Sequence, residues 1–136
     1  MTLTEFLLAR IYDDECLARM AFADHNGNGP DWSEQWSGAV EMGGDEHELL
    51  LCNDSGVSRH IENFDPARVL AECEAKRRIL VTFSMIEKMP RSGLQISTLE
   101  WDVMEDSVKA LAWVYSNHPD YLPEWKPLVA AEAKQQ

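Results

Sequence analysis

The feature that most constrains the fold is a helix-start signal in the middle of the chain, Asp65-Pro66. An aspartate here can accept hydrogen bonds from the free N–H groups of a first helical turn, and proline suits the first helical position. Apolar residues then follow at helical spacings: Val69, Leu70, Cys73, Leu80 and Val81. This pattern predicts a helix over about 66–88, ended by Pro90.

Other segments carry helix signals of the same kind. Thr2 and Glu5 have capping-box spacing and are followed by an apolar face, which predicts a helix over about 3–23. Ser97 or Thr98 can begin a helix over about 98–117. A shorter helix, over about 55–63, is expected to lead into the central one.

The segment between the first two helices has strand signals. Residues 24–33 are rich in asparagine, glycine and proline, which indicates a loop. The run over 35–42 alternates, the run over 47–53 is apolar, and a Gly-Gly-Asp turn separates them, which predicts a hairpin over about 34–52. We therefore expect a single domain over 1–136, α+β and mainly helical, with three longish helices, a β-hairpin packed on them and an irregular C-terminal tail.

The acidic charge of the chain limits its partners. The formal net charge is −12, and residues 1–60 hold 12 acidic and 3 basic residues. Such a chain is repelled by nucleic-acid phosphates and anionic membranes, so we expect neither as a direct partner. Three cysteines without framework spacing argue against a secreted disulfide scaffold, which favours a cytoplasmic protein with reduced thiols.

Motifs for metals and catalysis are incomplete. Residues 24–29 resemble the first half of an EF-hand calcium loop, but Gln35 stands where that loop needs a bidentate glutamate, so a plain Asn/Gly turn is favoured. Cys52, His60 and Cys73 do not have zinc spacing. No nucleophile motif or phosphate-binding loop occurs either, so we predict no metal, no cofactor and no catalytic residues.

Five tryptophans are many for a chain of this length, and two of them lie in the acidic half. Trp32 and Trp36, if exposed and ringed by acidic side chains, form what a protein-binding hot spot looks like. The alternative is that both cover the inner face of the hairpin. His60 and Arg77 are further binding candidates, because helix capping and intrahelical ion pairs do not account for them.

Three segments together resemble a family of small uncharacterised proteins from actinobacteria and their phages. They read "MTLTEFLLARI", "HIENFDPARVLAECEAKRRIL" and "NHPDYLPEWKP". The resemblance implies a cytoplasmic bacterial or phage setting and assigns no catalytic residue. It adds His118 and Asp120 to the candidates, either as part of a polar site with His60 and Asp65 or as a packed joint.

Three functions follow, in this order of preference. The first is a non-enzymatic accessory protein that binds and modulates another protein, host or self, through its acidic, tryptophan-bearing half. The second is a DNA-mimicking inhibitor of a nuclease or other DNA-binding protein, with carboxylates in two rows. The third is a metal-dependent enzyme that uses His60, Asp65, His118 or Asp120.

Overall fold

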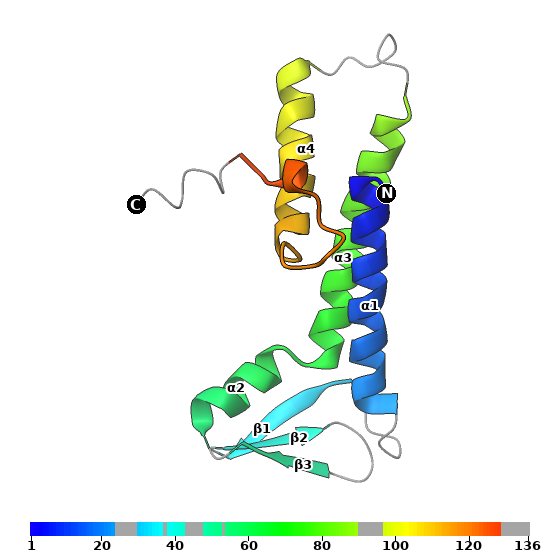
Figure 1. Ribbon diagram of the computed structural model, residues 1–136. Helices are drawn as coiled ribbons and strands as arrows, with labels where there is room; N and C mark the ends of the chain where they lie inside the picture. The colour runs from blue at the N-terminus through cyan, green and yellow to red at the C-terminus, as the bar shows by residue number, and fades with distance from the viewer. Residues whose placement is uncertain (24–29, 37, 43–47, 53, 90–96, 129–136) are drawn as a thin grey trace, which may run out of the picture. The chain divides into compact units, whose positions relative to one another are not determined.

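The computed structural model describes residues 1–23, 30–36, 38–42, 48–52, 54–89 and 97–128. In chain order the elements are α1 (Leu3–Ala23), β1 (Trp32–Trp36), β2 (Ala39–Met42), β3 (Glu48–Leu51), α2 (Ser55–Asn63), α3 (Pro66–Glu87), α4 (Thr98–Trp113) and the short 3-10 helix η2 (Pro123–Trp125) (Figure 1). Within these residues, four α-helices and one small antiparallel sheet confirm the expected fold class, α+β and mainly helical.

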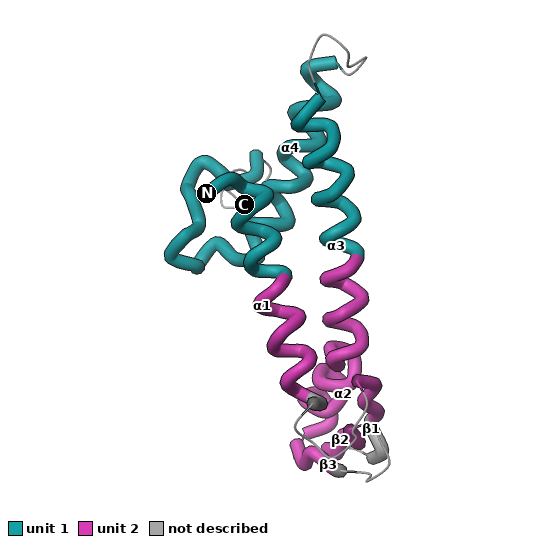
Figure 2. The backbone as a smooth tube through the Cα atoms, turned by 90° about the vertical axis from the view of Figure 1, so that its right-hand side faces the viewer, with its two compact units in different colours: residues 1–11, 75–136 teal, residues 12–74 magenta. Residues whose placement is uncertain are grey.

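The chain divides into two compact units. One comprises residues 1–11 and 75–136, and the other comprises residues 12–74 (Figure 2). Both dividing lines fall inside helices, one in α1 and one in α3. That the whole chain forms a single domain stays a prediction.

Two of the helices begin with a capping box. At the start of α1, the Thr2 N–H donates to Glu5 Oε2 (2.7 Å) and the Glu5 N–H donates to Thr2 Oγ1 (3.1 Å). At the start of α4, Ser97 and Glu100 exchange the same two bonds, at 2.7 and 3.3 Å. Each box satisfies N–H groups that a helix leaves unpaired at its N-terminus, so Ser97, and not Thr98, is the cap of α4.

The sheet has three strands where the sequence predicted two. The strands β1, β2 and β3 form an antiparallel meander with β2 in the centre. The run over 35–42 is shared by β1 and β2, because Gly38 lies between them with a φ of 94°, a left-handed conformation that costs glycine little. The predicted Gly-Gly-Asp turn at 43–45 lies outside the described residues.

Helix α2 packs on this sheet, within the unit of residues 12–74. The buried Ser58 hydroxyl accepts a hydrogen bond from the Gly38 N–H (3.3 Å) and donates one to the Ser55 carbonyl (3.1 Å). A buried hydroxyl without partners would be costly, and these two bonds remove that cost. The contact connects the turn between β1 and β2 to the first turn of α2.

The predicted cap Asp65 has two functions in the same unit. Its Oδ1 atom accepts from the Arg68 N–H (2.8 Å), which caps α3 at the predicted start. Its Oδ2 atom accepts from the Trp32 N–H (3.2 Å). The Ala67 N–H also donates to the Pro30 carbonyl (3.0 Å), so the starts of β1 and α3 are held together.

Helix α4 is shorter than the sequence predicted, ending at Trp113 instead of near 117. The residues that follow form turns, in which the N–H groups of Tyr115 and His118 donate to carbonyls three residues earlier, at 2.9 Å each. Pro119 keeps the chain from returning to a helix at His118, because a proline disfavours helical conformation in the residue before it and cannot continue the helix itself.

The capping box of α4 makes stability depend on pH. Hydrogen bonds from the backbone and the side chain of Ser97 lower the pKa of the Glu100 carboxyl below its ordinary value of 4.5. Its carboxylate therefore stabilises the fold above that value, and the stabilisation is lost as the pH falls through the lowered pKa of the folded state. We expect Glu100→Gln to be less stable than the wild type at neutral pH, with a difference that shrinks as the pH falls through the lowered pKa. Urea denaturation at neutral pH and over a series of acidic pH values measures this, and a difference that stays constant as the pH falls would contradict it.

Candidate functional site

An aromatic cluster surrounds Phe6 in the unit of residues 1–11 and 75–136. The Phe6 side chain is fully buried, and its ring centroid lies 5.0 Å from that of Trp125, 5.7 Å from that of His118 and 6.0 Å from that of Tyr121. Burial raises the pKa of the Tyr121 hydroxyl, against the opposing charge of Lys109. The cluster holds the C-terminal segment against the first half of α1 (Figure 1).

A polar group borders this cluster. Arg10 Nη1 lies 3.0 Å from Nδ1 and 2.5 Å from Nε2 of His118, and 3.9 Å from Asp120 Oδ2. The Asp120 N–H also donates to His118 Nδ1 (3.2 Å). With Phe6 against the imidazole, these contacts join the turn at 118–120 to α1.

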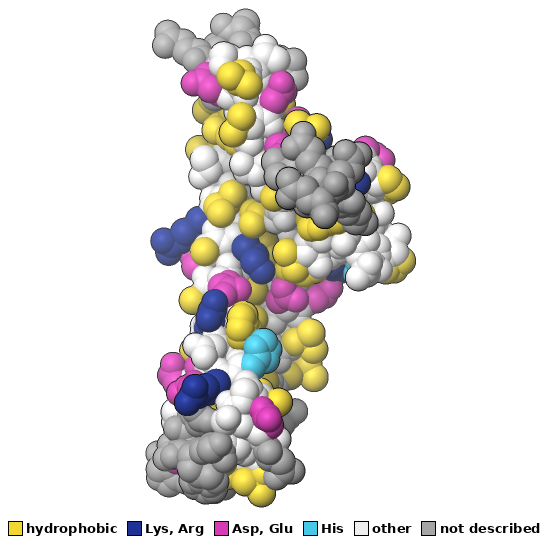
Figure 3. Space-filling view, turned by 90° about the vertical axis from the view of Figure 1, so that its left-hand side faces the viewer, with side chains coloured by type: hydrophobic (Ala, Val, Ile, Leu, Met, Phe, Trp, Pro, Cys, Tyr) yellow, Lys and Arg dark blue, Asp and Glu magenta, His cyan; other side chains and the backbone are white. Residues whose placement is uncertain are grey.

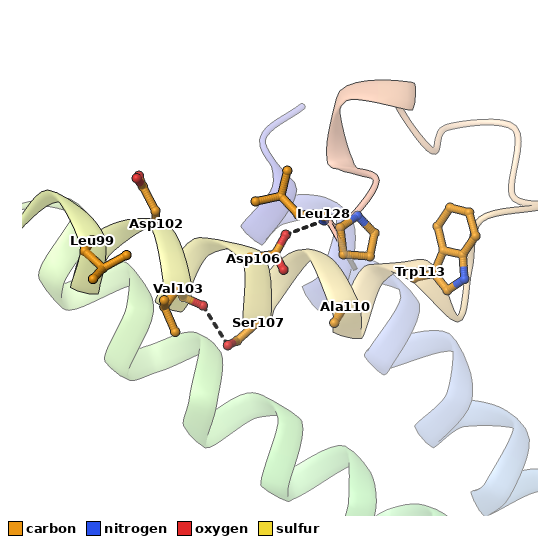
Figure 4. Close-up of a pocket in the computed structure, with 9 residues that line it drawn as sticks. Leu99, Asp102, Val103, Asp106, Ser107, Ala110, Trp113 and Leu128 are labelled. Carbon is orange, nitrogen blue, oxygen red and sulfur yellow. Dashed lines mark hydrogen bonds between the residues drawn. The ribbon is translucent and has the colours of Figure 1, made fainter. Parts of the chain in front are cut away.

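Beyond Trp125, the chain lies beside α4. The Leu128 N–H donates to the carboxylate of Asp106 (2.7 Å), and Pro127 is buried. Figure 4 shows this bond, with Leu128 next to the helix. One face of α4 therefore forms the first wall of a groove, and residues 127–128 form the second wall.

An open apolar groove of about 710 Å³, here the α4 groove, lies between these walls (Figure 4). Its lining side chains are Leu99, Asp102, Val103, Asp106, Ser107, Ala110, Trp113, Pro127 and Leu128. Large apolar side chains in it are open to solvent: Leu99 is 72% exposed, Val103 60% and Leu128 74%. Leaving apolar surface in water is unfavourable by roughly 25 cal/mol for each Å², so a partner that covers it gains that free energy.

Helix α4 therefore has two apolar faces. One face is covered: Val108 and Ala112 are buried, and Trp101 stacks on Phe83 of α3 with 5.6 Å between ring centroids. The other face is the groove. A smaller hollow of about 250 Å³ between α3 and α4 adjoins it, since both are lined by Ser107, and its other lining residues include Phe83.

The lining of the α4 groove is mostly apolar and includes two acidic side chains. Asp102 and Asp106 are its charged lining residues. Figure 3 shows hydrophobic and acidic side chains together in the upper part of the face that carries α4. This combination favours a ligand that is both apolar and positively charged.

Comparison with protein families places the chain in a family. The sequence model of a family of unknown function, DUF6221, matches residues 1–127. The chain belongs to this family. No similar protein was found among curated proteins or solved structures. The DUF6221 match covers every helix and strand of the described residues and the whole groove except Leu128.

Two of the predicted binding residues of the DUF6221 chain can be placed in the unit of residues 12–74. The half-buried Trp32 lies at the start of β1, and no hydrogen-bond partner of its buried indole N–H is found among the described residues. The side chain of Trp36 lies outside what the structure describes. His60 is exposed on α2, and its ring lies 4.7 Å from that of Phe64. That these residues bind a partner stays a prediction.

The other three predicted residues lie in the unit that contains the groove. His118 and Asp120 form the polar group with Arg10, and Arg77 is half-buried on α3. None of the three lines the α4 groove. Leu99 and Val103 lie in the helix predicted over about 98–117, and neither was among the predicted binding residues. Their spacing to Ala110 and Trp113, on a face distinct from that of Val108, is the signal that identifies a second apolar stripe.

Two features are absent from the described parts of the DUF6221 chain. No group of three or more histidine, cysteine or acidic side chains lies close enough together there to hold a metal ion. None of the helices there is both long and apolar enough to cross a bilayer. The half-match to a calcium loop at 24–29 falls outside these residues.

The aromatic cluster generates a stability prediction. We expect Phe6→Ala to lower the free energy of unfolding by about 3–5 kcal/mol, because the ring is fully buried and leaves a cavity. Phe64→Ala is the matched control: that ring is 50% exposed, so we expect a loss of about 1 kcal/mol. Urea denaturation measures both. Equal losses would mean that the ring of Phe6 is no more important to stability than an exposed one.

Proposed function

We propose that this DUF6221 protein is a non-enzymatic accessory protein that binds and modulates another protein through the α4 groove. The observation that carries the proposal is the exposure of Leu99, Val103 and Leu128 in the lining of one groove. Large contiguous apolar surfaces on soluble proteins mark interaction sites, because water contact with them is unfavourable until a partner covers them. A bacterial or phage cytoplasm is the setting that we propose for it.

The α4 groove lies in a different part of the chain from the partner-binding surface that the sequence predicted. The sequence directed attention to the acidic half with Trp32 and Trp36, whereas the open apolar surface described above belongs to residues 99–128. Trp113 at one end of the groove supplies the aromatic anchor that is common in binding hot spots. Acidic lining residues fit the expectation of a partner with a basic surface.

Two valines of equal exposure allow a matched test. Val103 lines the groove and is 60% exposed, while Val81 on α3 lies outside it and is 58% exposed. A photo-crosslinking amino acid is placed at either position in cells that carry the native gene. We expect one discrete crosslinked protein from position 103 and none from position 81, because only the groove is covered by the partner.

Substitution of the same positions completes the test. We expect Val103→Glu to reduce recovery of the crosslinked protein by at least about tenfold in a pull-down, and Val81→Glu to leave recovery unchanged. Both positions are exposed, so both variants should fold, which circular dichroism checks. Identical crosslinking at the two positions, or equal recovery by the two variants, would refute binding through the groove. The DNA-mimicry hypothesis predicts instead that Val103→Glu does not reduce recovery, because an added carboxylate does not weaken a contact made by carboxylates.

A further inference from the structure

The side chains of the α4 groove repeat as they do in helices that pack along another helix. Leu99, Val103, Asp106, Ala110 and Trp113 are separated by four, three, four and three residues. This spacing keeps one seam of side chains facing a neighbour over several turns. From Leu99 to Trp113 the seam is about 21 Å long, which matches a partner helix of about four turns.

The backbone hydrogen bonds of α4 also favour a helical ligand over an extended one. The N–H and C=O groups in the interior of α4 are bonded to each other within the helix, so they cannot form a ladder with an extended peptide. An extended peptide in this groove would therefore leave some of its own backbone groups without partners. In a helical ligand the backbone N–H and C=O groups are already bonded to each other, so only its side chains need to contact the groove.

The charges of α4 determine which kind of helix fits. Helix α4 contains one basic residue, Lys109, whose Nζ atom is paired with Oε1 of Glu105 at 2.8 Å. It contains four acidic residues: Glu100, Asp102, Glu105 and Asp106. Lysine and arginine beside an apolar stripe would meet the lining carboxylates of Asp102 and Asp106. A second copy of the chain would instead bring a further net charge of −12 and a second pair of these carboxylates.

We infer that the α4 groove binds a basic amphipathic α-helix of a partner protein, an inference that rests on the proposed function. Aliphatic side chains at positions i, i+3 or i+4, and i+7 of that helix contact Leu99, Val103 and Leu128. Its lysine or arginine side chains lie against Asp102 and Asp106.

A synthetic peptide tests this without knowledge of the partner. The peptide has four helical turns, with leucine at every third or fourth position and lysine elsewhere; a second peptide has the same composition in scrambled order. We expect the full chain to bind the ordered peptide at least about tenfold more tightly than the scrambled one in a calorimetric titration. The affinity should fall with added salt, since screening weakens the contribution of Asp102 and Asp106.

The two valines again separate groove binding from general attraction to an acidic protein. Val103→Glu and Val81→Glu each add one negative charge, so attraction to net charge alone would strengthen both equally. We expect Val103→Glu to weaken binding of the ordered peptide about tenfold, and Val81→Glu to change it less than about twofold. Asp102→Asn should weaken binding roughly threefold. Equal affinity of the two glutamate variants, or of the two peptides, would overturn the inference.

Two further outcomes distinguish this inference from the proposed function. If position 103 crosslinks to a partner in cells but the ordered peptide does not bind, the helix inference is wrong and groove binding stands. If the molar mass in sedimentation is that of a dimer and Val103→Glu makes it a monomer, the occupant is a second copy and the inference is also overturned.

Discussion

The contact between Phe6 and Trp125 is the interaction on which the proposed site depends. Both side chains are buried, and their ring centroids are 5.0 Å apart. By holding the C-terminal segment against α1, the contact places Pro127 and Leu128 where Leu128 can bond to Asp106 of α4. Without it, the α4 groove would have one wall instead of two, and a large part of its apolar lining would be lost.

The groove also explains an otherwise unfavourable distribution of side chains on α4. A helix that faces one neighbour needs a single apolar stripe, and α4 has two. The stripe with Val108 and Ala112 contributes to the stability of the fold. The stripe with Leu99 and Val103 contributes nothing comparable, since both side chains are mostly exposed. The two carboxylates of the groove would speed the encounter with a basic partner, while its apolar side chains would determine how long the complex lasts.

Much of the fold could be predicted from local signals in the sequence. Thr2, Asp65 and Ser97 indicated helix starts because capping depends on residues a few positions apart. The division of the run over 35–42 into two strands was missed, because a strand pattern of period two continues unchanged across Gly38 while the chain reverses there. The early end of α4 was also missed, because the nearest helix-breaking residue after it, Pro119, lies six residues beyond Trp113.

The candidate site was less predictable, because it depends on which apolar residues remain uncovered. Leu99, Val103 and Val108 are equally apolar in sequence, yet the first two are exposed and the third is buried. Which face of α4 is covered depends on α3, and the second wall depends on a contact between Phe6 and Trp125 that are far apart in the chain. Local periodicity contains neither piece of information.

The most direct measurement of the central claim is methyl NMR of the full chain during titration with the basic amphipathic peptide. The account predicts that the methyl signals of Leu99, Val103 and Leu128 shift and saturate together, while those of Val81 stay in place. Shifts spread evenly over the methyl groups of the chain, or confined to residues outside the α4 groove, would contradict it.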